Sequence, residues 1–82
     1  MKPKVKTIIM TCSISPSQWV GKTENGSDLY IRYRWGGLSV DVNDIEILYA
    51  DCGHGYDGEM TTARMMGLTK DVLDWSEAEV EG

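Results

Sequence analysis

The sequence predicts an α+β fold, in which a three- to four-stranded antiparallel β-meander carries one or two short C-terminal helices packed on one face. Two observations support this prediction. Apolar and polar residues alternate between turn signals over much of residues 4–50, and two short helical patterns follow residue 59. With 82 residues the chain is expected to form a single domain, 1–82, whose ends at 1–3 and 78–82 fray.

The strongest local signal is a β-hairpin over Leu29–Val42. Aromatic and β-branched residues flank Gly36-Gly37, and a glycine pair accepts the positive φ angles of a two-residue type I′ turn. With that turn Tyr33 points inward, whereas Arg32 points outward opposite Asp41. One face of the hairpin is then apolar and the other polar, as expected for a half-buried antiparallel pair.

Three further segments have the character of strands. Residues 4–14 carry apolar groups on both sides, which predicts either cover on both faces or pairing with a second copy. Residues 18–23 return through Asn25-Gly26, the dipeptide preferred in two-residue turns, and that turn would place Trp19 opposite Arg32 on the outer face. Asn43-Asp44 is a polar turn into a strand over residues 45–50.

Two short helices are predicted after the strands. The first covers residues 60–66, with Thr61 or Thr62 as the N-cap and Gly67 as the C-terminal stop. The second starts after Thr69 and runs from residue 70 to about residue 78. The apolar side chains expected in the core are Val20, Leu29, Ile31, Tyr33, Trp35, Leu38, Val40, Val42, Ile45 or Ile47, Met65, Leu68, Val72, Leu73 and Trp75.

Charge is distributed unevenly along the chain. Residues 1–40 contain six Lys/Arg and two acids, whereas residues 41–82 contain two Lys/Arg and eleven acids, for a net charge of −5. An acidic half argues against nucleic acid as the main partner and favours a basic protein surface. The apolar run at residues 8–10 is too short for a signal peptide, and no stretch is long enough to span a membrane, so a cytoplasmic location is expected.

Residues with metal-binding or catalytic potential are few. Cys12, Cys52 and His54 offer three soft ligands for zinc, which Asp51 or Asp57 could complete, but the chain has no Cys-x-x-Cys pair. The same stretch has glycines where an EF-hand requires acids, and Cys52 with His54 lacks a third, orienting group for catalysis. We therefore expect no metal, no cofactor and no enzymatic activity, with a small metal-binding or catalytic protein that uses residues 51–57 as an alternative.

Partner-binding residues are expected in two places. The outer face of the predicted sheet would bring together Trp19, Tyr30, Arg32 and Arg34, and aromatic and arginine side chains dominate binding hot spots. The same residues could stack single-stranded bases, or could stabilise the sheet without any partner. The acidic half supplies further candidate contacts, which are Asp41, Asp71, Asp74 and Glu77.

The pattern of residues 19–38 resembles one found in short bacterial and phage proteins to which no activity is attached. It reads Trp19-x-Gly21-x-Thr23-x-x-Gly26-x-x-x-Tyr30-Ile-Arg-Tyr-Arg-Trp-Gly36-x-Leu38. In size, acidity and lack of catalytic motifs the chain also resembles the anti-CRISPR proteins, the small inhibitors that phages use against host defence. This second resemblance is one of type, so it transfers no functional residue.

The sequence as a whole predicts a non-enzymatic acidic binding protein. Its most specific form is an inhibitor that occupies a basic surface of a larger protein or ribonucleoprotein complex that handles nucleic acid in host defence, by imitating the charge of nucleic acid. A single-stranded nucleic-acid binder that uses the outer sheet face is a further alternative, disfavoured by the net charge.

Overall fold

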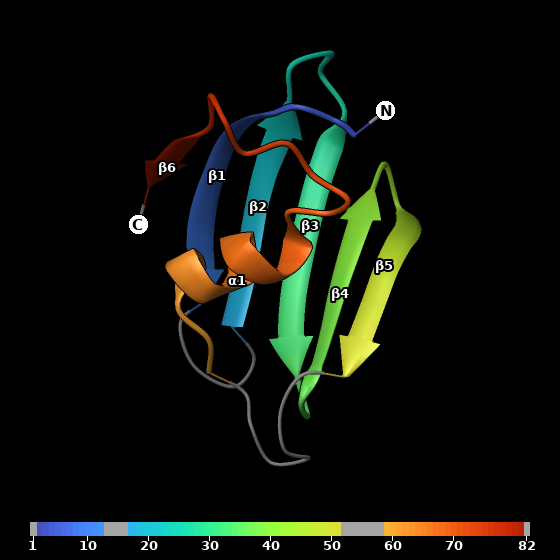
Figure 1. Cartoon of the computed structure of the whole chain (residues 1–82), viewed down its shortest axis with the longest axis vertical. Coiled ribbons are helices and arrows are strands. Elements are labelled where there is room, and N and C mark those ends of the chain that lie inside the picture. Colours follow the sequence, from blue (N-terminus) through green and yellow to red (C-terminus); the bar gives the residue numbers. More distant parts are fainter. Residues whose placement is uncertain (1, 13–16, 52–58, 82) are drawn as a thin grey trace.

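The computed structural model describes residues 2–12, 17–51 and 59–81. A single sheet runs through the molecule, and one helix lies against one of its faces (Figure 1). The elements in chain order are β1 (Val5–Cys12), β2 (Ser17–Thr23), β3 (Asp28–Arg34), β4 (Gly37–Val42), β5 (Ile45–Asp51), α1 (Thr62–Thr69) and β6 (Glu79–Glu81).

The sheet has six strands in the order β5-β4-β3-β2-β1-β6. Strands β1 to β5 form an antiparallel meander, and β6 pairs in parallel with the other edge of β1. The predicted fold class, a three- to four-stranded meander with one or two helices, is therefore wrong. The sheet is larger and mixed, and the described residues contain the single helix α1.

The predicted second helix does not form, and residues 70–78 instead make turns and a single bridge from Asp74 to Lys4. The backbone N–H of Val5 donates to the carbonyl of Asp74 at 2.9 Å, and the N–H of Asp74 donates to the carbonyl of Pro3 at 2.9 Å. Thr69 does not cap a new helix. It ends α1, and its hydroxyl donates to the carbonyl of Met65 and accepts from the indole N–H of Trp75. Residues 79–81, expected to fray, instead form β6 because they find backbone partners on β1.

The hairpin between β3 and β4 turns one position earlier than predicted. Trp35 and Gly36 occupy the turn with φ angles of 56° and 76°, the left-handed pair of a type I′ turn. Gly37 is the first residue of β4 and pairs with Arg34. The register therefore shifts by two residues, so Tyr33 stays inside and Arg32 stays outside as predicted, but Trp35 leaves the core.

The hairpin between β2 and β3 has a longer loop than predicted, which reverses the facing of β2. The N–H of Thr23 donates to the carbonyl of Ser27, and the N–H of Gly26 donates to the carbonyl of Thr23, so three residues lie between the closing pair Thr23 and Ser27. Gly26 alone has a positive φ, 87°, as in a type I turn followed by a glycine. The register moves by one residue, Trp19 pairs with Ile31, and its side chain points inward.

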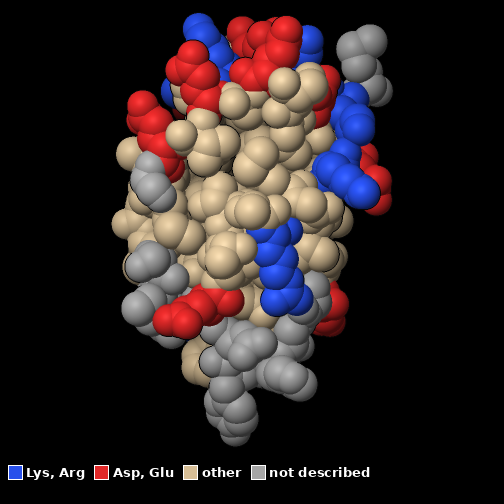
Figure 2. All heavy atoms as spheres, turned by 60° about the vertical axis from the view of Figure 1, so that its left-hand side comes forward, with Lys and Arg blue, Asp and Glu red and all other residues tan. Residues whose placement is uncertain are grey.

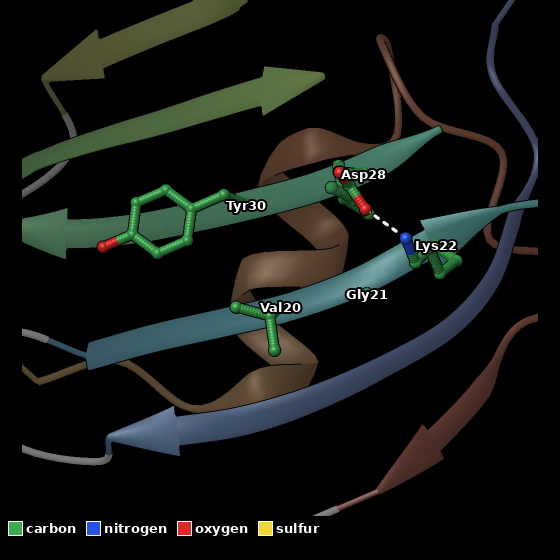
Figure 3. A pocket seen from close by; sticks show the side chains of 6 residues that line it. Val20, Gly21, Lys22, Asp28 and Tyr30 are labelled. Carbon is green, nitrogen blue, oxygen red and sulfur yellow. Dashed lines mark hydrogen bonds and ion pairs between the residues drawn. The ribbon is translucent and has the colours of Figure 1, made fainter. Parts of the chain in front are cut away.

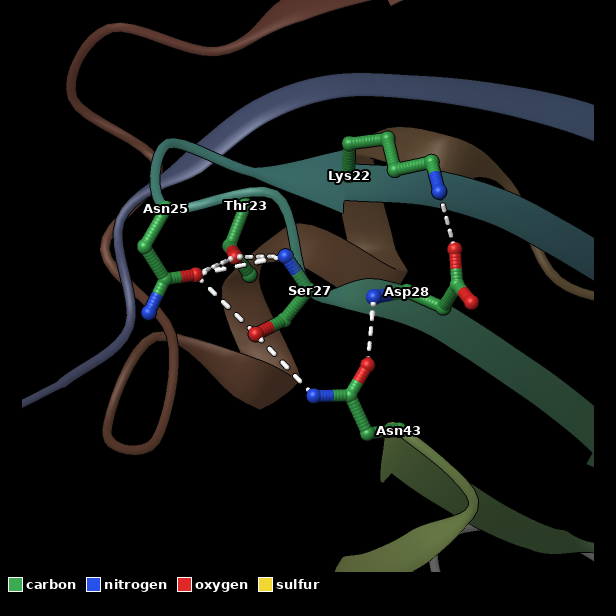
Figure 4. Close-up of polar contacts among 6 residues, drawn as sticks. All are labelled: Lys22, Thr23, Asn25, Ser27, Asp28 and Asn43. Atoms are coloured by element: carbon green, nitrogen blue, oxygen red, sulfur yellow. Dashed lines mark hydrogen bonds and ion pairs between the residues drawn. The ribbon is translucent and has the colours of Figure 1, made fainter.

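Side-chain hydrogen bonds hold this loop at its length (Figure 4). The amide oxygen of Asn25 accepts from the backbone N–H and the hydroxyl of Ser27, and the N–H of Ser27 also donates to the hydroxyl of Thr23. Asn43, in the next turn along the sheet, accepts from the N–H of Asp28 and donates to the hydroxyl of Ser27. Two turns at the same end of the sheet are thereby tied together.

The core lies between the inner sheet face, α1 and the segment that follows α1. Trp19 is fully buried, and its indole N–H donates to the hydroxyl of Thr62 at 2.9 Å, which links β2 to the helix. Of the predicted core residues, Val20, Trp35, Ile45, Ile47 and Leu68 are exposed. The fully or nearly fully buried apolar side chains are Val5, Ile8, Trp19, Leu29, Ile31, Tyr33, Leu38, Val40, Met60, Met65 and Leu73.

Candidate functional site

The sheet face opposite α1 is the candidate functional site, and we call it the outer face. No described helix or strand packs over it, and its side chains are half-buried or exposed. In Figure 3, Val20 and Tyr30 lie on the near side of the sheet while α1 lies behind it. The strand register places its side chains in rows: Ile9, Val20, Tyr30, Asp41 and Glu46 form one row, and Gln18, Arg32, Ser39 and Tyr49 form the next.

The tip of the β3–β4 hairpin projects an exposed indole. Trp35 is 62% exposed, and the guanidinium carbon of Arg34 lies 5.6 Å from the centre of its ring, within the range of a cation–π contact. Trp35 also has a φ of 56°, in the left-handed region that bulky side chains rarely adopt. The turn therefore holds a large aromatic group in solvent at a position that favours glycine or asparagine.

Tyr49 continues the aromatic surface from the tip onto β5. A methyl group at Gly37 would overlap the hydroxyl of Tyr49, which shows that the phenol ring lies against the backbone of Gly37. Gly37 in turn pairs with Arg34, and Tyr49 pairs with Ser39 beside Arg32. Two arginines and two large aromatic rings thus share one end of the outer face.

A shallow hollow lies at the middle of the outer face, over β2 and β3 (Figure 3). Val20 and Tyr30 flank it, the ion pair between Lys22 and Asp28 closes one end, and its volume is about 380 Å³. Its lining is mainly apolar. Gly21, which lies between Val20 and Lys22 in β2, has no side chain to fill the hollow. A hollow of this size and composition can accept one apolar side chain of a partner.

The charges of the outer face are mixed but predominantly acidic. Neither Arg32 nor Arg34 forms an ion pair with any residue that the structure describes. Asp41 and Glu46 are directly opposite each other on neighbouring strands, so two like charges share one row. Among the described strand residues, the register directs Lys22, Arg32 and Arg34 to this face, and Lys6 at the bulge of β1 lies beside Lys22. The acidic side chains directed to it are Asp28, Asp41, Glu46, Asp51, Glu79 and Glu81.

The predicted partner-binding residues do not form one site. Tyr30, Arg32, Arg34 and Asp41 share the outer face, as predicted. Trp19 does not belong to it, because the one-residue register shift buries its side chain. Asp71, Asp74 and Glu77 lie on the segment after α1, whose Leu73 packs into the core on the opposite side of the sheet.

Two of these acidic residues have structural partners. The amino group of Lys4 donates to the carboxylate of Glu77 at 3.1 Å, and this hydrogen bond and its charge raise the pKa of Lys4 above its ordinary value. Hydrogen bonds from the hydroxyl and the backbone N–H of Ser76 lower the pKa of the Asp74 carboxyl. The Lys4–Glu77 pair joins the C-terminal segment to the residue before β1, whereas the hydrogen bonds from Ser76 to Asp74 are local to that segment.

The opposite side of the molecule, seen from the edge formed by β6, has a different character (Figure 2). Uncharged side chains cover most of its centre, where one basic group also lies, while further acidic and basic groups gather at the top and along the sides. Leu68 on α1 and Val80 on β6 are 39% and 47% exposed. The described residues on this side contain no aromatic side chain as exposed as Trp35.

Sequence reasoning missed Trp35 and Tyr49 as surface residues. The Gly36-Gly37 pair placed the predicted turn one position too late: the turn is formed by Trp35 and Gly36, and Gly37 lies in close contact with Tyr49. Cys52, His54 and Asp57, the candidates for metal or catalytic chemistry, lie outside the described residues. Within the described ranges, no group of three or more His, Cys, Asp or Glu is arranged to hold a metal ion.

The described part of the chain contains no helix that is both long and apolar enough to cross a membrane. Comparison with protein-family models, with curated proteins and with solved structures finds no match for the chain.

Proposed function

We propose that this chain is a non-enzymatic binding protein whose outer face contacts a larger protein in the cytoplasm. The contact centres on Trp35, Arg34 and Arg32, with Tyr49 and the hollow beside Tyr30 as its continuation. These are the residue types that contribute most to binding hot spots, and they share an uncovered sheet face.

The observation that supports the proposal most directly is that Trp35 combines a left-handed backbone with an exposed side chain. A left-handed backbone at a non-glycine residue costs about 1–2 kcal/mol, and Trp35 receives little burial in return because it is 62% exposed. Strained residues with exposed aromatic side chains are typical of sites where a partner completes the contact. We therefore propose the indole of Trp35, with Arg34 beside it, as the anchor of the interface.

The charge of the outer face favours a protein over nucleic acid as the partner. Single-stranded nucleic acid also stacks on aromatic and arginine side chains of open sheets. Here, however, Asp41, Glu46 and Asp51 border the arginine-aromatic end, and acids outnumber bases on the whole face. These carboxylates repel a phosphate backbone but attract a basic protein surface.

The most specific form of the proposal is an inhibitor that occupies a basic, nucleic-acid-binding surface of a host defence complex. The net charge of −5 and the acidic bias of residues 41–82 support it. Such a complex should weaken steeply as salt is added, because the interaction depends on attraction between opposite charges.

The test compares two pairs of substitutions with the same change in charge. Arg32→Ala with Arg34→Ala alters the outer face, whereas Arg64→Ala with Lys70→Ala alters the helix side. A tagged chain captures protein from nuclease-treated lysate, and affinity for the purified partner is then measured by calorimetry. We expect the outer-face pair to weaken binding by ~10-fold or more, and the helix-side pair to leave it within about twofold.

Two results would contradict the proposal. The first is an equal effect of both pairs, which would indicate a general charge effect or another surface. The second is capture that succeeds from untreated lysate but fails from nuclease-treated lysate, which would indicate nucleic acid as the partner. Melting temperatures of all variants show whether a loss of binding is only a loss of folding.

A further inference from the structure

The two edges of the sheet differ in how well they are protected against a further strand. The β6 edge is three residues long and carries two acids, Glu79 and Glu81, so it is short and charged as protected edges usually are. The β5 edge is seven residues long, and within the described part of the chain β5 pairs with β4 alone. A strand of this length can hydrogen-bond a further extended segment along its free side.

The side chains of β5 are unusually apolar for an edge. Ile45 is 67% exposed, Tyr49 is 59% exposed and Ile47 is 39% exposed. Lysine and proline, which commonly guard natural edge strands, are absent from β5, and its protection is limited to Glu46, Asp51 and the bulge opposite Val40/Asp41. Exposed aliphatic and aromatic groups on an open edge provide apolar contacts for the side chains of an added strand.

The charge around β5 has a single sign. The sequence contains no Lys or Arg between Arg34 and Arg64, whereas the same stretch contains six acids. Three of them, Asp44, Glu46 and Asp51, lie within or next to β5. A second copy of β5 would bring two such acidic strands together, while a basic strand would neutralise them.

We propose that β5 accepts an extended segment of the partner protein in which basic and apolar side chains alternate, and that this segment adds a seventh strand to the sheet. This inference rests on the proposed function and names the chemistry of the partner. The alternation follows from the pleat: Glu46, Tyr49 and Asp51 lie on the outer face of β5, whereas Leu48 and Ala50 lie on the inner face. An added strand is therefore favoured when its basic side chains point to the outer face and its apolar side chains point to the inner face.

The test uses a synthetic probe and a matched pair of variants. The probe is a blocked octapeptide in which lysine alternates with valine and threonine, and its counterpart has glutamate in place of lysine. Glu46→Lys with Asp51→Lys reverses the charge at the β5 edge, and Glu79→Lys with Glu81→Lys makes the same change at the β6 edge. Each pair moves the net charge from −5 to −1, because each substitution adds two positive charges.

Binding is followed by NMR titration of the labelled chain and by hydrogen exchange of its backbone amides. We expect the lysine peptide to shift and protect amides of β5, and the β5 pair to weaken binding by about 10-fold or more. The β6 pair should leave the affinity within about twofold, and the glutamate peptide should not bind. N-methylation of alternate peptide bonds should also abolish binding, because it removes the donors of a strand ladder.

Several outcomes would overturn the inference. They are shifts confined to β3 and the Trp35 tip, equal weakening by both pairs, or equal binding of the two peptides. Self-association that rises with concentration and is lost in the β5 pair would instead assign the edge to a second copy. If the peptide fails while Arg32→Ala with Arg34→Ala still impairs capture of the partner, the edge inference falls and the proposed function stands.

Discussion

Replacing Trp35 with asparagine should make the protein more stable although it removes its largest exposed aromatic group. Trp35 has a φ of 56°, and a left-handed residue other than glycine costs about 1–2 kcal/mol, whereas asparagine tolerates this region well. The substitution also removes the contact with Arg34, whose guanidinium carbon lies 5.6 Å from the ring centre, and such exposed cation–π contacts contribute about 0.5–1 kcal/mol.

The difference between these two terms is a net stabilisation of about 0.5–1 kcal/mol, equivalent to a rise of about 2–8 °C in melting temperature for a domain of this size. Thermal and urea denaturation followed by circular dichroism would measure it. A double-mutant cycle with Arg34→Ala isolates the cation–π term, because Arg34→Ala should have no effect once Trp35 is asparagine. A loss of more than about 1 kcal/mol in Trp35→Asn would refute the reasoning, since the indole would then be stabilising the fold.

Three further predictions concern stability. Trp19→Phe should lower the free energy of unfolding by about 1–3 kcal/mol in urea denaturation, because it removes the buried hydrogen bond to Thr62 and part of a fully buried side chain. A loss below about 0.5 kcal/mol would contradict the burial of Trp19. Gly21→Ala should destabilise the protein by about 1–3 kcal/mol, because the added methyl group would overlap the carbonyl oxygen of Thr7. Gly67→Ala should stabilise it by about 0.5–1 kcal/mol, because Gly67 lies within α1 next to open space. Effects of the same sign at both positions would contradict this contrast. The Asp74 pKa is lowered on folding, so its contribution is complete above its ordinary pKa of 3.8 and is lost as the pH falls through the folded value. Asp74→Asn keeps the acceptor for the Ser76 N–H without titrating, so its urea midpoint should fall less than that of the wild type between about pH 5 and pH 2, and an equal fall would show that Asp74 does not contribute.

The two central hairpins show which part of the fold local sequence can predict. The alternation of apolar and polar residues located both pairs of strands correctly. The register, however, is set by the lengths of the hairpin loops, and these lengths depend on contacts with other parts of the chain. In the β3–β4 hairpin the error was two residues, so Tyr33 and Arg32 kept their predicted faces. In the β2–β3 hairpin it was one residue, which turned Trp19 inward. The N–H of Glu24 donates to the carbonyl of Lys4, a contact from a distant strand end that no local pattern contains.

The C-terminal half was predicted less well because its structure depends on non-local pairing. The helix N-cap at Thr61 follows from local preference, and the structure confirms it through the hydrogen bond from the N–H of Arg64. The Glu79–Glu81 strand has no turn or alternation signal of its own. It forms because its backbone pairs in parallel with the edge of β1 that β2 does not use. The bulge that opposes Val40/Asp41 of β4 likewise moves Leu48 inward and leaves Ile47 exposed.

The exchange of Trp19 and Trp35 also bears on function. Trp19 fills the core and donates to Thr62, and Trp75 packs against the core and donates to Thr69, whereas Trp35 is strained and largely exposed. A small domain has little stability in reserve, because it buries a smaller share of its surface than a large one does. A strained, solvent-exposed indole is therefore difficult to explain by folding alone. The proposed binding function would account for it, because a partner that buries the indole against Arg34 would supply the apolar contact that the free protein lacks.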